Sequence, residues 1–532
     1  MNNKNLRARN PLTIPQTEKS SEKQVKNNAG GYVFQVTPET QLKRFLIIGS
    51  TGSYYQPSKK MTDSNLVHVE EMWRKNPKET AQIIRDISKS GRAPNNDYAL
   101  AALAVGIGMR GDARLHAFSV LDDVARIGTH ILHLADFLKH RSGWGRSVRS
   151  HIANWYLGKT ADKLAYQVLK YQSRDGWSHK DLLSMCHALH NKTPMGVKNV
   201  LEYIMHDKIT PELTNAVSLI DGYEKIKKAT TVDEVVALMT KHNMPRELVP
   251  TQWLNEKAVW QVLLDGMVKN NLLEALIRNL NKVTALDMFK KKENLDNVVA
   301  VITSAENLKM ARLHPLKILI AMKQYSQGRG DKGSLTWTPV KKIEKALEDA
   351  FYASFDFVEP TGKNIMMALD VSGSMASEFY HGMSCFEAEV CLAMVTARTE
   401  KNHHMMKFHG QFVPIPVNPH GKLQDIINLI YDGNFGRTDC SLPMQYAIHH
   451  ELDIDTFVVY TDSETWAGIG APVEWLKKYR SKMNKPNAQL VVVAFTSTGF
   501  SIADPNDPGM LDVAGFDVNI AQILHSFICG EF

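Results

Sequence analysis

Cysteine is scarce in this sequence and follows no pattern. The five cysteines are odd in number, scattered over 532 residues and without a Cys-x-x-Cys pair. These features argue against a disulfide framework and an extracellular setting, and they favour reduced thiols. We therefore expect a cytoplasmic protein with a nuclear fraction. The cysteines are Cys186, Cys385, Cys391, Cys440 and Cys529.

Long hydrophobic runs are also missing. No segment approaches the ~18 apolar residues of a membrane span, and the first ten residues lack the apolar region of a signal peptide. Gly49 and Gly52 lie in a loop that no Gly-Lys-Ser/Thr follows, which excludes a phosphate-binding loop. We expect a soluble protein that has no membrane partner.

Basic residues are few in the last third of the chain and abundant before it. Residues 356–532 contain 11 Lys and Arg against 21 Asp and Glu, whereas residues 1–355 contain 52 against 35, a net charge of +17. A body of that charge suits a polyanion, and nucleic acid is the commonest polyanion inside a cell. A generic basic surface on a large helical domain is the alternative.

The length and the apolar periodicity predict more than one domain. A prior of about 150 residues per domain gives two to four units. Residues 1–30 are polar and charge-rich, which predicts a mobile arm. Residues 31–358 are assigned to a helical module, because apolar residues recur three and four apart almost throughout residues 66–347. Short breaks between so many helices favour a HEAT-like array curved into an arc or ring.

The window from Lys139 to Lys180 is the most basic part of this module. Its 42 residues contain nine Lys or Arg, six aromatic residues and only two acidic residues. A helix continued from Lys159 to Arg174 would place its cations on one stripe, opposite an apolar face. Ser178 is expected to cap the next helix, whose polar face would carry Lys180 and His187.

Such a surface would bind RNA, with cations on phosphates and His or aromatic groups on unpaired bases. A solvated lysine face with aromatic residues in the core is the alternative. The candidate RNA-binding residues are Arg141, Arg146, Arg149, Lys163, Lys170, Arg174, Lys180 and His187.

A second candidate site begins where an apolar run, Ile365 to Leu369, ends in the pattern Asp-x-Ser-x-Ser. The run predicts a buried parallel strand, and Asp370, Ser372 and Ser374 then place three oxygens in the loop at its carboxyl end. Oxygens arranged in this way can converge on a small hard cation. A strand end that is merely rich in serine is the alternative.

Strands and helices alternate through residues 359–532, which predicts an α/β domain with a parallel, doubly wound sheet. A further strand is expected near Val518 to Ile520. The other predicted strands are 365–369, 404–413, 456–460 and 489–495, and the predicted helices are 385–399, 423–431, 442–449 and 473–483.

Thr438 in a polar loop and Asp462 after a later strand complete a pattern that resembles the metal-ion-dependent adhesion site of von Willebrand factor A domains. The resemblance implies a Mg²⁺ ion held directly or through water. Such an ion, bound mainly by neutral hydroxyls, would keep an open position for an acidic group of a partner. Ser463 departs from the family, where Gly is common, and this affects the expected loop shape. The implied ligands are Asp370, Ser372, Ser374, Thr438 and Asp462.

The whole chain resembles the family of the 60-kDa Ro (SS-A) autoantigen, in which a TROVE module precedes an A domain. Three stretches carry the resemblance: 44–55, 171–183 and 368–375. It implies a ring of HEAT-like helices closed by the A domain. It also implies a protein, monomeric in a ribonucleoprotein, that binds small cytoplasmic Y RNAs on its outer surface. The central hole would take single-stranded ends of misfolded non-coding RNAs, such as 5S rRNA precursors, in RNA quality control.

Two other functions are weighed against this one. A Mg²⁺-dependent scaffold would capture an acidic protein ligand at the metal site, with RNA binding incidental. A metal-dependent hydrolase is disfavoured, because no candidate base stands in a recognisable arrangement and paired histidines such as His403-His404 lack ligand spacing. We therefore expect no catalytic residues.

Overall fold

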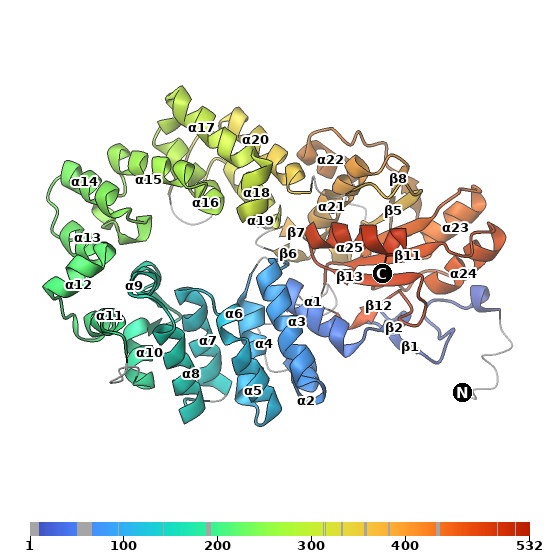
Figure 1. Cartoon of the computed structure of the whole chain (residues 1–532). Coiled ribbons are helices and arrows are strands. Elements are labelled where there is room, and N and C mark those ends of the chain that lie inside the picture. The colour runs from blue at the N-terminus through green and yellow to red at the C-terminus, as the bar shows by residue number, and fades with distance from the viewer. Residues whose placement is uncertain are drawn as a thin grey trace.

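A computed structural model describes most of the chain, in two parts that together form a ring. Helices α1 to α20 leave the C-terminal domain as an arc and return to it (Figure 1). The arc is helical and the C-terminal domain is α/β, which confirms the predicted fold class. The described residues are 10–49, 66–93, 95–141, 143–187, 193–311, 313, 315–330, 334–355, 359–380, 383–431, 437–496, 498–516 and 518–531.

Five helices of the arc begin at a Thr or Ser whose side chain caps them, and neighbouring helices pack on one another along the arc. Ser178 and Asp181 form a reciprocal capping box at α10, as predicted. No helix in the described ranges is long and apolar enough to cross a lipid bilayer. The helices are α1 (Pro38–Ile48), α2 (Val67–Lys75), α3 (Pro77–Ser90), α4 (Asp97–Gly108), α5 (Asp112–Ser119), α6 (Leu121–Val124), α7 (Gly128–Arg141), α8 (Arg146–Leu157), α9 (Ala161–Lys170), α10 (His179–Cys186), α11 (Met195–His206), α12 (Pro211–Ala216), α13 (Ser218–Ile226), α14 (Val232–His242), α15 (Lys257–Lys269), α16 (Leu273–Ala285), α17 (Lys292–Thr303), α18 (Ala305–Ala311), α19 (Pro315–Ser326) and α20 (Lys341–Ala353).

The C-terminal domain is built on a sheet with the strand order β13-β11-β10-β5-β8-β9. Strands β5 and β10 are buried along their whole length, which explains their continuous apolar sequences. The strands are parallel except β9, which forms a tight antiparallel hairpin with β8, so the expectation of a wholly parallel sheet is wrong at this edge. The strands are β5 (Ile365–Asp370), β8 (His403–Phe408), β9 (Phe412–Pro414), β10 (Thr456–Thr461), β11 (Gln489–Ala494) and β13 (Met510–Ala514), and the helices are α21 (Cys385–Thr399), α22 (Leu423–Ile430), α23 (Leu442–His449), α24 (Pro472–Lys482) and α25 (Val518–Cys529).

The strand expected near Val518 to Ile520 is wrong. These residues begin helix α25, and the strand at this side of the sheet is β13, which pairs with β11. Three residues are too few to distinguish a period of two from a period of 3.6, and the longer segment has its apolar residues three and four apart.

The N-terminal segment belongs physically to the C-terminal domain. Strand β1 (Gln24–Lys26) pairs with β2 (Tyr32–Gln35), and β2 pairs with β12 (Phe500–Ser501). Gln16 and Asn27 are almost fully buried there. The prediction of a mobile arm is therefore wrong for residues 10–30, whereas residues 1–9 lie outside the described ranges.

Two joints connect the arc to the C-terminal domain. In the first joint, the Arg44 guanidinium of α1 lies 2.5 Å from both carboxylate oxygens of Asp512 and donates to the carbonyl oxygens of Thr498 and Phe500. Its side chain is 1% exposed. This buried, multiply bonded ion pair stands beside the β2–β12 pairing and closes the ring.

The second joint lies where the chain passes from α20 into β5, and its ion pair is more exposed than that of the first joint. Lys323 Nζ of α19 lies 2.9 Å from the Glu387 carboxylate, with the two side chains 38% and 21% exposed. The Arg398 guanidinium lies over the Tyr352 ring, 3.1 Å from its centroid. Two elements of the arc thus contact α21, and water still reaches Lys323, Glu387 and Arg398. Tyr352 is buried, and the buried ring of Phe351 stacks on Phe516 of the C-terminal domain.

Candidate metal centre and candidate nucleic-acid surface

The candidate metal centre lies at the carboxyl edge of the sheet, where β5 and β10 end side by side. Their parallel register pairs Leu369 with Tyr460, so the next residues, Asp370 and Thr461, are neighbours. Thr461 Oγ1 donates to Asp370 Oδ2 over 2.6 Å. Polar groups that are far apart in the chain therefore meet because parallel strands end at one edge.

The loop after β5 turns its hydroxyls toward this edge. Ser372 N donates to Asp370 Oδ1 over 3.0 Å, and the Ser372 and Ser374 hydroxyl oxygens lie 3.1 Å apart. The Ser374 hydroxyl also lies close enough to the Asp462 carboxyl to oppose the rise of its pKa. The structure thus brings together four of the five residues implied as ligands.

Thr438, the fifth, is buried and reaches the same region through its backbone. Its carbonyl oxygen accepts from the backbone N–H groups of Trp466 and Ala467, each over 3.1 Å. This joins the loop before α23 to the loop after β10, which carries Asp462.

Negative charge is concentrated and buried at this edge. Burial raises the pKa of Asp370 to about 7, and the nearby Asp462 carboxylate contributes to that increase. The same two causes raise the pKa of Glu464 to about 7. Burial also raises the pKa of Asp462 and of Glu389, which accepts from the backbone N–H of Asp370. Among the described residues, none of these four carboxyl groups has a Lys, Arg or His ion-pair partner.

The donor set fits a hard divalent cation. Asp462 Oδ2 is buried and has no hydrogen-bond partner among the described residues, and such an atom is costly unless something binds it. No group of three or more His, Cys, Asp or Glu side chains suited to a metal occurs in the described ranges, so hydroxyl oxygens would have to supply much of the coordination. Asp370, Asp462 and the hydroxyls of Ser372 and Ser374 would supply it.

Glu389 and Gln16 are parts of this region that sequence reasoning missed. Glu389 is a fully buried acidic residue within the apolar helix α21. An acidic residue in an otherwise apolar helix is visible in the sequence and could have indicated its place in the site. Gln16 reaches Asp439 from more than 400 residues away, and no local pattern could have indicated it.

The candidate RNA-binding residues lie on α7 to α10 and on one short hairpin. Helix α9 ends at Lys170, and Arg174 lies on β3 (Ser173–Arg174), which pairs with β4 (Trp177–Ser178). The expected helical stripe through Arg174 is therefore wrong. Asp175 and Gly176 both have positive φ, and Asp-Gly between two short strands is a strong hairpin signal that could have shown the turn.

These candidates differ in whether another group already binds them. Arg141 pairs with Glu70 over 3.2 Å, Lys180 lies 3.6 Å from Asp207, and Lys170 Nζ donates to the Tyr166 hydroxyl. His187 is exposed but ends α10 in the left-handed conformation, so it leaves the expected helix face. The Lys and Arg candidates whose side chains have neither an ion pair nor a hydrogen bond to any described residue are Arg146, Arg149, Lys163 and Arg174.

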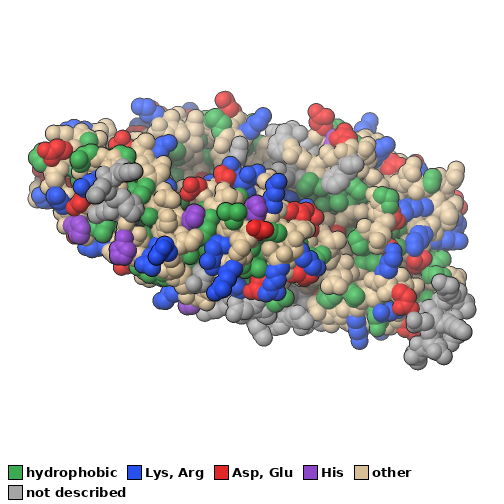
Figure 2. Space-filling view, turned by 60° about the horizontal axis from the view of Figure 1, so that its bottom comes forward, with side chains coloured by type: hydrophobic (Ala, Val, Ile, Leu, Met, Phe, Trp, Pro, Cys, Tyr) green, Lys and Arg blue, Asp and Glu red, His purple; other side chains and the backbone are tan. Residues whose placement is uncertain are grey.

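The aromatic residues of this window divide between core and surface. Trp155 and Tyr156 are buried, whereas Trp144 and Trp177 are half-buried and pack against each other with ring centroids 5.4 Å apart. Tyr166 is exposed beside Lys170. Figure 2 shows the underside of the arc, where Lys and Arg side chains are interspersed with Asp and Glu. Cationic and acidic side chains are therefore mixed on this face (Figure 2).

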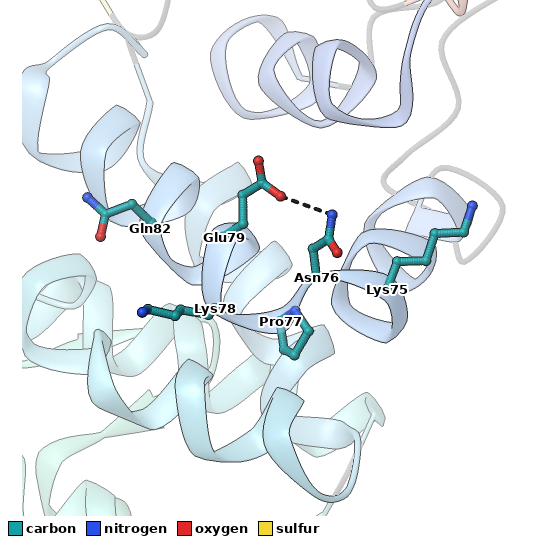
Figure 3. A pocket seen from close by; sticks show the side chains of 6 residues that line it. All are labelled: Lys75, Asn76, Pro77, Lys78, Glu79 and Gln82. Atoms are coloured by element: carbon teal, nitrogen blue, oxygen red, sulfur yellow. Dashed lines mark hydrogen bonds between the residues drawn. The ribbon is translucent and has the colours of Figure 1, made fainter.

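An open pocket of about 500 Å³ lies where α2 meets α3. In Figure 3 the Asn76 side chain points toward the Glu79 carboxylate, to which it donates over 3.0 Å. The lining residues surround one helix junction, and none of them belongs to either candidate site.

Known proteins resemble both parts of the chain. Residues 25–324 match the TROVE domain family and residues 364–528 match the Ro60 vWA domain family. RNA-binding protein RO60 of Deinococcus radiodurans is 37% identical over 535 residues, which cover 99% of each chain. RNA-binding protein RO60 of Caenorhabditis elegans is 35% identical over 97% of this chain and 92% of its own. The crystal structure of the Deinococcus radiodurans RO (RSR) protein superposes with a TM-score of 0.71 at 33% identity, over 93% of this chain and 100% of that one.

Proposed function

This chain belongs to the Ro60 family and is a non-catalytic RNA-binding protein, and from that premise we propose that it acts in RNA quality control. Its ligands are small cytoplasmic Y RNAs and the single-stranded ends of misfolded non-coding RNAs such as 5S rRNA precursors. It forms the single protein core of a ribonucleoprotein in the cytoplasm, with a nuclear fraction.

The unpaired cations on α8, α9 and the β3–β4 hairpin are the observation that carries this proposal. Arg146, Lys163 and Arg174 are exposed, and Arg149 is partly exposed. A cation with no protein partner loses no ion pair when it binds a phosphate, so each is available to a polyanion. Their spacing over two helices and a hairpin suits a folded RNA, while Tyr166 offers an exposed ring to an unpaired base.

The arc also explains how one protein would accept many misfolded RNAs. Shape and backbone contacts do not require a consensus sequence, and a basic enclosure attracts a single strand. A free 3′ end can thread into a closed ring, whereas a folded RNA with no tail cannot.

The test is binding of a structured small RNA, with and without a single-stranded 3′ tail, across a range of salt concentrations. The full chain is used, because the first joint would be missing from an isolated arc. The variant removes four unpaired cations, and the control removes four exposed lysines that already have acidic partners. The variant is R146Q/R149Q/K163Q/R174Q, and the control is K225Q/K290Q/K342Q/K345Q.

The variant should bind more weakly, and the slope of log affinity against log salt should flatten by about four, since each substitution removes the cation that neutralises one phosphate. The control should retain most of the affinity, although the two proteins have the same net charge. Equal decreases in both would mean that only overall charge matters. Unchanged affinity for the variant would exclude this surface, and indifference to the tail would exclude the quality-control role.

A second function, Mg²⁺-dependent capture of an acidic protein, is favoured by the unpartnered Asp462 Oδ2. A cation held there by two carboxylates and hydroxyls would keep an open position for a partner carboxylate. Immobilised full-length protein should retain an acidic peptide in Mg²⁺ and release it in EDTA. Asp370→Ala and Ser374→Ala should each abolish retention while leaving RNA affinity unchanged. Retention that survives EDTA would contradict a metal-mediated contact.

A further inference from the structure

Residues 10–36, named here the N-terminal clasp, are bonded to the loops of the candidate metal centre. Gln16, which is 2% exposed, donates from Nε2 to Asp439 Oδ1 over 2.8 Å. Its Oε1 accepts from Thr465 Oγ1 over 2.5 Å. One amide side chain thus bridges the loop before α23 and the loop after β10.

Asn27 makes a second bridge from the clasp. Its Nδ2 donates to the carbonyl oxygens of Ser463 and Thr465, over 3.2 and 2.9 Å, while its Oδ1 accepts from Gly31 N within the clasp. The fit is close, since a Cβ on Gly31 would lie 1.9 Å from the Thr465 carbonyl oxygen.

The clasp also holds a carboxylate beside the candidate ligands. Asn28 Nδ2 donates to Glu464 Oε1 over 2.7 Å, and Ala29 N donates to Glu464 Oε2 over 3.0 Å. Both oxygens are therefore occupied, and Glu464 is turned toward the clasp. Glu464 N in turn donates to Asp462 Oδ1 over 3.0 Å, which fixes the carboxylate whose other oxygen has no partner among the described residues.

These bonds reach the two loops that carry Thr438 and Asp462, at positions one to three residues from each. Ordinary packing of a terminal segment on a domain has no reason to concentrate its buried side-chain bonds there. Groups that orient metal ligands without binding the metal are commonly built in this way, and removing one typically weakens metal affinity by about 10- to 100-fold.

We propose that the N-terminal clasp positions the ligand loops of a divalent-cation site, with Gln16 and Asn27 as positioning residues. The inference rests on the proposed metal site and adds that residues 10–36 set its affinity. Neither residue contacts the cation. Each acts by fixing the loop residues that directly follow Thr438 or Asp462.

Titration of the full chain with Mn²⁺ by calorimetry tests the proposal. Gln16→Ala removes the bridge between the two loops and should weaken Mn²⁺ binding by about tenfold. Asn27→Asp keeps the acceptor for Gly31 N but removes both donated bonds, and it should also weaken binding even though an added negative charge alone would tighten it. Lys23→Ala, an exposed change within the clasp, is the matched control and should bind as the unmodified protein does.

The melting temperature in EDTA and at one fixed Mg²⁺ concentration separates positioning from mere stability. A purely structural change lowers both melting temperatures equally. A substitution of a positioning residue also reduces the increase that Mg²⁺ produces, because that increase depends on the ratio of Mg²⁺ concentration to Kd. RNA affinity of the same proteins should not change.

The outcomes distinguish this inference from the proposed functions. If the unmodified protein bound no Mn²⁺, the metal site and the inference would both be overturned while the RNA function stood. The unmodified protein could instead bind Mn²⁺, with Gln16→Ala binding it equally well and showing an equal increase in melting temperature on adding Mg²⁺. Only the role of the clasp would then be overturned.

Discussion

The two joints of the ring are built differently. The first joint places a fully buried arginine in a bidentate pair with Asp512 and adds the pairing of β2 with β12. The polar groups of the second joint, Lys323 with Glu387 and the stacked Arg398, remain partly in water. Beside them the buried rings of Phe351 and Phe516 stack on each other.

Chain continuity accounts for the difference. The second joint lies beside the covalent passage from α20 to β5, so its partners are held near one another whether or not they bind. Arg44 and Asp512 are separated by 468 residues, and their joint must oppose the opening of the whole arc without a covalent link beside it. The joint that lacks a covalent link has the more deeply buried ion pair.

The largest effect is expected from Arg44→Ala. It leaves the Asp512 carboxylate largely buried without its partner, and breaking such a pair typically costs about 3–5 kcal/mol. Urea unfolding would measure the decrease in stability, and small-angle scattering should show an opened ring. Lys43→Ala on the same helix, whose pair with Glu39 is exposed, is the control. Equal unfolding midpoints for the two variants would show that the first joint contributes no more than a surface pair.

Acid should destabilise the part of the arc next to the first joint, which includes helices α2, α7 and α10. Burial lowers the pKa of His179 to about 4, and it lowers the pKa of His68 to about 4 and of His130 to about 3. Because the folded pKa lies below the unfolded value near 6.5, each buried neutral histidine contributes fully to the free energy of unfolding above pH 6.5. That contribution is lost as pH falls toward 4. For His179 the decrease amounts to about 3 kcal/mol.

Limited proteolysis between pH 7 and 4.5 checks this expectation. Cleavage within α2, α7 and α10 should increase before cleavage within α15 to α20. His179→Gln should be less stable than the unmodified protein at pH 7 but show a flatter pH profile. Simultaneous cleavage of both sets of helices would refute the expected difference in acid sensitivity between the two parts of the arc.

Gly31→Ala breaks the clasp without changing any charge. The added methyl group would lie 1.9 Å from the Thr465 carbonyl oxygen, and overpacking of this kind costs about 1–3 kcal/mol. Gly145→Ala is the control, because Gly145 has a φ of −65° and open space around it. The two urea midpoints should differ clearly, and coincident curves would mean that the clasp can shift away from the sheet.

The smallest effect is expected from Lys323→Ala at the second joint. Exposed ion pairs contribute about 0.2–1 kcal/mol, and this one is more than a third exposed on its lysine side. Urea unfolding beside Arg44→Ala gives the comparison directly. A larger decrease for Lys323→Ala than for Arg44→Ala would reverse the order of the two joints.

Local patterns predicted much of the C-terminal domain correctly. Strand β5 is a buried apolar run, and helix α21 begins at a capping box formed by Ser384 and Glu387. These signals act over a few residues, so the sequence displays them directly. The strand pattern also predicted the edge at which Asp370 and Asp462 meet, because neighbouring parallel strands end at the same edge of a sheet.

Errors arose where distant residues decide the structure. Polar residues near the N-terminus indicated a mobile arm, but Gln16 and Asn27 find polar partners more than 400 residues away. Arg44 sits within an apolar stretch, and nothing beside it identifies Asp512. The prediction of a helix through Arg174 had a local cause instead, because the periodicity was continued beyond Lys170 up to the turn at Asp175 and Gly176.

The distance between Arg44 and Asp512 also has a consequence for biosynthesis. At ~5–20 residues per second, a ribosome adds the 468 residues between them in roughly 25 to 90 s. For most of that interval β2 lacks β12, and Gln16 lacks its partners Asp439 and Thr465. Ring closure is therefore among the last events of folding, and an RNA present during translation meets an open arc before it meets a ring.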